Sequence, residues 1–112
     1  MPELHTVHSD SPRFASEAPR FLIVDDDEVD RLSCHRMLKE CFGLSSKIEE
    51  ATNWDDAVVA IATRDHDVYF IDQNLDGRAG LDLVQKFRRE MPDQVFILLT
   101  GQDDRELDLA AA

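Results

Sequence analysis

The chain has 112 residues, enough for one domain, and 43% of them are hydrophobic, which excludes a collagen-like or disordered protein. Its 24 Asp and Glu residues outnumber its 12 Lys and Arg residues, so the net charge is −12. Nucleic acid and anionic membrane surfaces attract basic patches, so we expect neither to bind this segment.

Residues 1–20 are predicted to form a flexible N-terminal tail, and residues 21–112 to form the domain. Three of the four prolines lie in the tail, and neither a strand period nor a helix period is visible there. His5 and His8 have the spacing of a possible metal-ligand pair. Because no further ligand lies nearby in the sequence, we interpret them as solvated side chains.

Short apolar runs after the tail predict strands. Residues 21–24, 68–71 and 95–99 are apolar on both faces, as strands buried in a parallel sheet are. Residues 46–51 carry charges that suit an edge strand. No run approaches the roughly 20 apolar residues that span a bilayer, and the N-terminus shows no secretory signal.

Amphipathic stretches between these runs predict helices. The first begins in the acidic run at 25–28 and ends at Gly43, a residue suited to a helix end. Thr52 or Asn53 is expected to cap the second helix, and the third ends before Pro92. Residues 103–112 are expected to begin a fourth. The predicted apolar faces are Cys34, Met37, Leu38 and Cys41, then Trp54, Ala57, Val58 and Ile61, then Leu81, Leu83, Val84 and Phe87.

The two cysteines, Cys34 and Cys41, are both predicted to be core residues of the first helix. Two helical turns place their Cα atoms about 10 Å apart, too far for a disulfide. Free cysteines indicate a reducing compartment, so we expect the protein to be cytoplasmic. The alternation of strands and helices predicts an α/β fold with an open parallel sheet and right-handed crossovers.

Acidic residues and one hydroxyl follow the predicted strands. Sites in open parallel sheets form beyond the carboxyl ends of the strands, where Asp25, Asp26, Asp72 and Thr100 are expected to meet. Each aspartate alone is also a common helix-start or turn residue, but their joint pattern favours a site. Clustered carboxylates repel one another, and Mg²⁺ is the usual oxygen-ligated cation that relieves this. A carboxylate beside the metal is then a candidate nucleophile for an aspartyl phosphate.

These residues resemble the receiver domain of two-component response regulators. The matching text is FLIVDDD at 21–27, FIDQNL at 70–75 with Gly80-Leu81, and LLTG at 98–101. The resemblance implies a flavodoxin-like, doubly wound sheet. It also implies that Asp72 accepts the phosphoryl group, that Thr100 is the switch hydroxyl, and that Asp25, Asp26, Asp72 and the Asn74 carbonyl bind Mg²⁺. A histidine kinase or phosphotransfer protein would supply the phosphate.

Two departures from the family concern the C-terminal end. The lysines are Lys39, Lys47 and Lys86, so none follows Thr100, where the family has a phosphoryl-contacting lysine. The sequence also ends at Ala112 inside the predicted fourth helix. We therefore expect a receiver that is incomplete at its C-terminus, with strand order 2-1-3-4 and no fifth strand or fifth helix. Residues 95–99 would then form an apolar edge strand, which favours a homodimer or exchange of elements between chains.

Two alternatives use the same residues differently. An aspartyl-phosphate phosphatase places its nucleophile in a D-x-D pattern after the first strand, and the run at 25–27 contains one. Such an enzyme also needs a downstream lysine and a longer chain, so we expect no enzyme beyond self-catalysed phosphotransfer and dephosphorylation. A degenerate or truncated receiver would act only in protein–protein interaction and dimerisation, although its acidic triad is complete.

Overall fold

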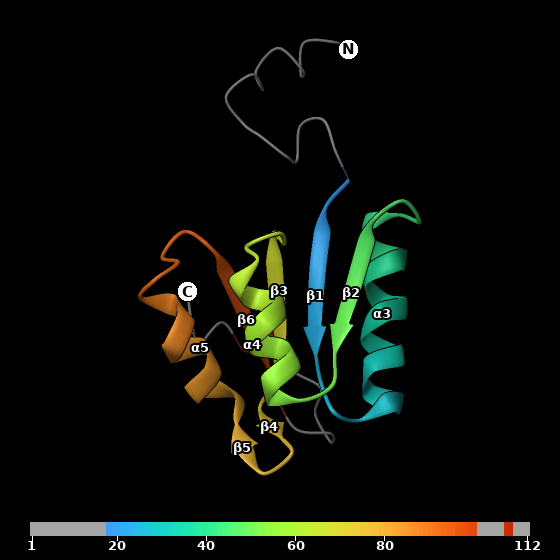
Figure 1. Cartoon of the computed structure of the whole chain (residues 1–112). Coiled ribbons are helices and arrows are strands. Elements are labelled where there is room, and N and C mark those ends of the chain that lie inside the picture. Colours follow the sequence, from blue (N-terminus) through green and yellow to red (C-terminus); the bar gives the residue numbers. More distant parts are fainter. Residues whose placement is uncertain (1–17, 101–106, 109–112) are drawn as a thin grey trace.

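The computed structural model describes residues 18–100 and 107–108, and its centre is a parallel sheet (Figure 1). The parallel strands are β1 (Arg20–Val24), β2 (Lys47–Ala51), β3 (Val68–Asp72) and β6 (Val95–Leu99). Their order is β2-β1-β3-β6, which confirms the predicted doubly wound sheet. Residues 1–17 of the predicted tail, with His5 and His8, lie outside the described residues.

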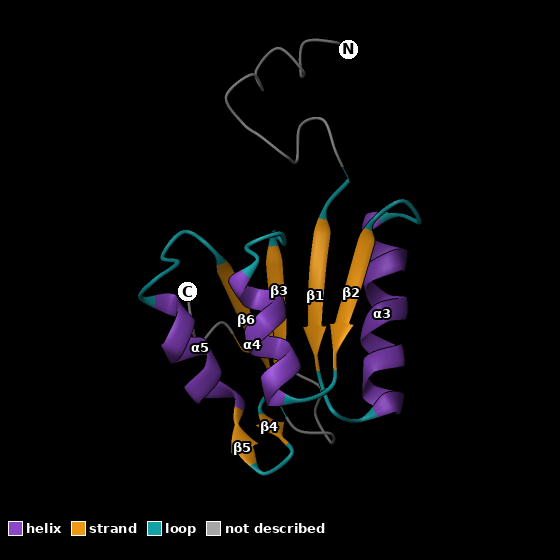
Figure 2. Ribbon diagram, viewed as in Figure 1, coloured by secondary structure: helices purple, strands orange, loops and turns teal. Residues whose placement is uncertain are grey.

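Helices cover both faces of the sheet (Figure 2). α3 (Glu28–Phe42) packs on one face, whereas α4 (Trp54–Ala62) and α5 (Gly80–Arg88) pack on the other. The Asp27 carboxylate accepts the Asp30 backbone N–H at 2.8 Å, and Asn53 likewise caps α4 through Asp56 N–H at 2.8 Å. The second helix is therefore capped by Asn53 rather than Thr52. Gly43 ends α3 at φ +97°.

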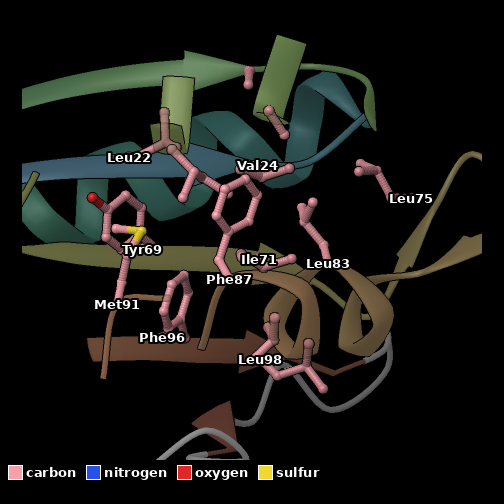
Figure 3. Packing of buried hydrophobic residues seen from close by; sticks show 14 residues of the cluster. Leu22, Val24, Tyr69, Ile71, Leu75, Leu83, Phe87, Met91, Phe96 and Leu98 are labelled. Atoms are coloured by element: carbon pink, nitrogen blue, oxygen red, sulfur yellow. The ribbon is translucent and has the colours of Figure 1, made fainter. Parts of the chain in front are cut away.

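Side chains along each strand alternate between the two faces of the sheet, so the core consists of two clusters, one on each face. The larger cluster joins β1 and β3 to α4 and α5, and Figure 3 shows the Phe87 ring close to Val24 and Ile71. Tyr69 and Phe96 stack in this cluster with ring centroids 4.9 Å apart. The smaller cluster joins Phe21, Ile23 and Phe70 to Cys34 and Leu38 of α3.

The predicted apolar stripe of α3 is only partly correct. Cys34 and Leu38 are buried, but Cys41 is exposed and Met37 is 37% exposed. Within the described part of the chain, α3 is the one helix on its face of the sheet, so its Met37 and Cys41 flank has no neighbouring helix to pack against (Figure 2). The prediction that Cys41 is a core residue was therefore wrong.

The stretch expected to begin a fourth helix contains a short strand instead. β7 (Leu107–Asp108) pairs antiparallel with β6, with Leu98 opposite Asp108 and Leu99 opposite Leu107. An edge strand carries unpaired N–H and C=O groups, and β7 satisfies some of them at the end of β6. Residues 101–106 and 109–112 lie outside the described residues. Among the described residues, no helix has the length and apolarity needed to cross a membrane.

A small hairpin that the sequence did not predict follows β3. Its strands are β4 (Asn74–Leu75) and β5 (Arg78–Ala79), paired antiparallel. Asp76 and Gly77 form its turn with φ values of +54° and +87°. The Asn74 side-chain oxygen accepts the Gly77 N–H at 3.2 Å across this turn. The hairpin projects beyond the carboxyl ends of β1 and β3 (Figure 1).

Candidate functional site

Three carboxylates gather where β1 and β3 end. One oxygen atom from each of Asp25, Asp26 and Asp72 can be chosen so that all lie within 4.8 Å of one another. Asp25 is buried at 2% exposure, Asp72 is half-buried and Asp26 is exposed. The parallel pairing of Val24 with Ile71 brings these ends together, because both strands run in the same direction.

Backbone hydrogen bonds fix the two strand ends. The Asp25 N–H donates to the Ala51 carbonyl at 3.1 Å, and the Asp25 carboxylate accepts the Asp27 N–H at 2.9 Å. Beyond Asp72, the Gln73 N–H donates to the Leu99 carbonyl at 2.8 Å. The carboxylates of Asp25 and Asp72 therefore project from backbone that the sheet itself holds in place.

Burial and mutual repulsion raise the pKa of two of these groups. The pKa of Asp25 is raised to about 7, mainly by burial and further by the negative charges of Asp72 and Asp30, while the hydrogen bond from the Asp27 N–H opposes the rise. Burial also raises the pKa of Asp72, opposed by the Asn74 N–H and reinforced by the charge of Asp26. Both raised pKa values mean that burial and mutual repulsion disfavour the state in which Asp25 and Asp72 are both ionised.

The donor set suits a hard divalent cation. All three groups offer carboxylate oxygens, which Mg²⁺ prefers. The three oxygens lie within 4.8 Å of one another, near enough for one ion to be held by all three. A cation bound here would offset the repulsion that contributes to the raised pKa values of Asp25 and Asp72.

An open cleft of about 310 Å³ lies over this cluster. Its walls come from the start of α3, the end of β3 and the β4–β5 hairpin. The lining residues are Asp26, Asp27, Asp30, Asp72, Gln73, Asn74, Asp76 and Gly77. Asn74 therefore lies at the cleft, as a metal-binding carbonyl would require. Among the residues that the structure describes, no lysine or arginine lines this cleft.

Thr100 is the remaining residue that the sequence placed at this site. It directly follows β6, and the register pairs its neighbour Leu99 with Asp72. Thr100 is half-buried and lies at the same end of the sheet as the carboxylates. The individual roles of Asp72, Thr100 and Asn74 stay predictions.

Sequence reasoning missed two contributors to this site. Asp30 and Asp76 line the cleft, Asp30 from the first turn of α3 and Asp76 from the hairpin turn. Asp30 lies four residues after Asp26, a helical spacing that could have indicated it. The place of Asp76 depends on the positive φ of the turn, for which the Asp-Gly pair at 76–77 was a usable signal.

The buried Asp25 should make the metal-free protein less stable as pH rises. Its pKa is raised in the fold, so the folded state keeps a proton that the unfolded chain loses between pH 3.8 and about 7. We expect Asp25→Asn in EDTA to be more stable than wild type at pH 8 by about 1–2 kcal/mol, or several degrees in melting temperature, but not at pH 4. Thermal melts of both proteins across this pH range measure the difference.

Asp93→Asn is the control for this pH experiment, because Asp93 is exposed at the opposite end of the sheet, just before β6. Its stability should follow that of the wild type throughout. An Asp25→Asn variant that shows the full pH dependence of the wild type would contradict the assignment of this proton to Asp25.

Comparison with known proteins defines the family. A family model described as the response regulator receiver domain matches residues 21–112. The chain belongs to this family, and the resemblance drawn from the sequence is confirmed. Curated proteins named as response regulators are among its relatives.

Two curated relatives and one solved structure illustrate the similarity. Sensory transduction protein LytR of Staphylococcus haemolyticus is 33% identical over 82 residues, 73% of this chain and 32% of that protein. Response regulator UvrY of Escherichia coli is 33% identical over 86 residues, 77% of this chain and 39% of that protein. The crystal structure of TrrA from Thermotoga maritima in complex with Mg²⁺-BeF is 27% identical, with a TM-score of 0.66 over 76% of this chain and 71% of that chain. This chain therefore spans about a third of the length of these curated relatives.

Proposed function

We propose that this chain is the phosphoacceptor receiver of a cytoplasmic two-component phosphorelay and takes a phosphoryl group onto Asp72 with Mg²⁺. The observation that carries the proposal is the buried Asp25, held with Asp26 and Asp72 so that three carboxylate oxygens lie within 4.8 Å. Burying a carboxylate beside two others is costly, as the pKa of about 7 shows. A bound cation would offset this cost and would explain why the three carboxylates lie together.

In the proposed reaction, the residues at the carboxyl ends of the parallel strands have separate roles. A carboxylate oxygen of Asp72 bonds to the phosphorus, while the phosphorus–nitrogen bond to a phosphohistidine of a histidine kinase or phosphotransfer protein breaks. Asp25, Asp26, Asp72 and the Asn74 carbonyl would hold Mg²⁺, which would supply positive charge to offset the charge of the phosphoryl oxygens. The Thr100 hydroxyl donates a hydrogen bond to a phosphoryl oxygen and couples phosphorylation to a downstream output. Beyond this self-catalysed transfer and its hydrolysis, we propose no enzymatic activity.

Chemical phosphorylation tests the proposal directly. Acetyl phosphate and Mg²⁺ are incubated with the protein, the acyl phosphate is trapped with borohydride, and mass spectrometry maps the reduced residue. We expect a Mg²⁺-dependent product at Asp72, because a bound cation would offset phosphoryl charge. A product on Asp26 with Asp72 unmodified would overturn the assignment.

Binding of Mg²⁺ should be visible without phosphorylation. A cation that binds only the folded chain stabilises it by about 1.4 kcal/mol at ten times its dissociation constant, or several degrees in melting temperature. We expect millimolar Mg²⁺ to raise the melting temperature of the wild type but not of Asp26→Ala, which lacks an exposed ligand. Asp93→Ala, the matched control, should respond as the wild type does. If Mg²⁺ has no effect while Asp26→Ala itself raises the melting temperature, the cluster is acidic without being a metal site.

A second candidate function is a receiver that acts only through protein contacts and a homodimer. The exposed flank of α3 at Met37 favours it. β7 covers part of the β6 edge, so we expect a second chain to pack on that α3 flank or to exchange β7. Sedimentation velocity at low micromolar concentration should then show a dimer. A monomer that unfolds cooperatively would exclude this assembly.

A further inference from the structure

Arg31 links the first turns of α3 to the backbone of the acidic site. Its Nη1 donates to the backbone carbonyl oxygen of Asp25 at 3.1 Å. Its Nε donates to the carboxylate of Glu50, on strand β2, at 3.2 Å. The Arg31 side chain is only 16% exposed, which is low for an arginine on a helix surface. Two directed hydrogen bonds therefore hold the Arg31 side chain between strand β2 and the acidic site.

Glu50 is itself held in position. The register of β1 and β2 pairs Ile23 with Glu50 and Val24 with Ala51, so Glu50 lies beside the end of β1. Its second carboxylate oxygen is 3.0 Å from Nδ1 of His35, which lies one helical turn after Arg31. β2 thereby fixes the position of the Arg31 guanidinium.

The hydrogen bond to the Asp25 carbonyl acts on two candidate metal ligands at once. That carbonyl belongs to the peptide group that joins Asp25 to Asp26, so its direction sets the orientation of both residues. The N–H of Asp25 is already bound to the Ala51 carbonyl at 3.1 Å. With Arg31 on the carbonyl, both backbone polar groups of Asp25 are fixed.

We propose that Arg31, anchored by Glu50, is a positioning residue that holds the Asp25–Asp26 peptide in the orientation needed to bind Mg²⁺. This inference rests on the proposed function. It predicts a change in Mg²⁺ affinity that is opposite in direction to the change expected from charge alone. Removing a positive charge near a cation site should tighten cation binding by reducing repulsion. Removing a residue that orients the ligands should weaken it, by about 10-fold for a group behind a metal ligand.

The test measures the Mg²⁺ dissociation constant of the folded full chain by calorimetric titration, well below the melting temperature. We expect Arg31→Ala to weaken Mg²⁺ binding about 10-fold. Arg36→Ala is the matched control, because Arg36 is exposed on the same helix and its loss changes the net charge equally. The control should bind Mg²⁺ as well as the wild type or slightly better. Melting temperatures in EDTA report separately on stability, which a purely structural role would change without changing the affinity of the folded protein.

Two further variants keep the test decisive if Arg31→Ala folds poorly. Arg31→Gln keeps a side-chain donor and should fall between Arg31→Ala and the wild type. Glu50→Ala releases the anchor and should weaken Mg²⁺ binding less than Arg31→Ala, with no additional loss in the double variant, because Glu50 acts through Arg31.

Affinity in Arg31→Ala equal to or tighter than in the Arg36→Ala control would overturn the positioning role and leave the proposed function standing. Additive losses from Arg31 and Glu50 would likewise overturn the claim that they act as one unit. A wild-type chain that binds no Mg²⁺ would overturn the proposed function, and the positioning role with it.

Discussion

Asp72→Asn should reduce acyl-phosphate formation to background while the protein stays folded. The amide is nearly isosteric with the carboxylate but has no anionic oxygen to attack phosphorus. Relief of repulsion from Asp26 should leave the variant at least as stable as the wild type in EDTA, because burial and that charge raise the pKa of Asp72. The measurement is borohydride trapping after treatment with acetyl phosphate and Mg²⁺, together with a thermal melt.

Asp76→Asn is the matched control for this experiment. Asp76 lines the same cleft from the hairpin turn, and Asn tolerates its φ of +54° as well as Asp does. The substitution is chemically identical, yet phosphorylation should continue at Asp72. If Asp76→Asn abolishes the product and Asp72→Asn does not, the nucleophile lies on the hairpin and the proposed assignment is wrong.

Gly80→Ala should destabilise the protein strongly. A Cβ at Gly80 would lie far inside van der Waals distance of the Asp72 backbone carbonyl oxygen, and 3.1 Å from Cγ2 of Ile71. The Gly80 N–H also donates to the Gln73 carbonyl at 2.8 Å, so α5 cannot move away without losing that bond. We expect a loss of about 3 kcal/mol or more in the free energy of unfolding, measured by chemical denaturation.

Gly43→Ala provides the comparison for this variant. Gly43 has φ +97°, which an alanine adopts with strain, but a Cβ added there would meet no described atom within 4 Å. Its loss should be about 1–2 kcal/mol, and its Mg²⁺ affinity should equal that of the wild type. Gly80→Ala should weaken Mg²⁺ binding as well, because its clash is with the backbone of Asp72. Equal losses of stability in Gly80→Ala and Gly43→Ala would show that the backbone between β3 and α5 shifts at little cost to accommodate a Cβ.

The order of the parallel sheet could be predicted because it depends on local patterns. Apolar runs at 21–24, 68–71 and 95–99 indicated buried strands, and right-handed crossovers left few ways to arrange them. The meeting of Asp25 and Asp26 with Asp72 followed from the same reasoning, since parallel strands end at a common edge. The match to known receiver domains then agreed with an inference that rested on a few short motifs.

Other features depended on which elements lie next to each other in space. Cys41 satisfies the helical period of its stripe, yet it is exposed because no helix packs beside that flank of α3 in the described part of the chain. β7 pairs with β6 where a helix was expected, because an open sheet edge offers hydrogen bonds that local propensity does not anticipate. A hydrophobic period identifies the face of a helix but does not identify what covers it.

The sequence by itself determined the fold family and the cluster of candidate ligands, through strand patterns and residues at strand ends. Only the tertiary structure decided how deeply each of those ligands is buried. Asp25 is buried and takes a pKa of about 7, whereas its neighbour Asp26 is exposed, although the two are identical and adjacent in the chain. Tertiary structure also brought Arg31 to the carbonyl of Asp25 through Glu50, 19 residues further along the chain. Burial and directed hydrogen bonds arise from packing between distant segments, so no pattern within one segment could reveal them.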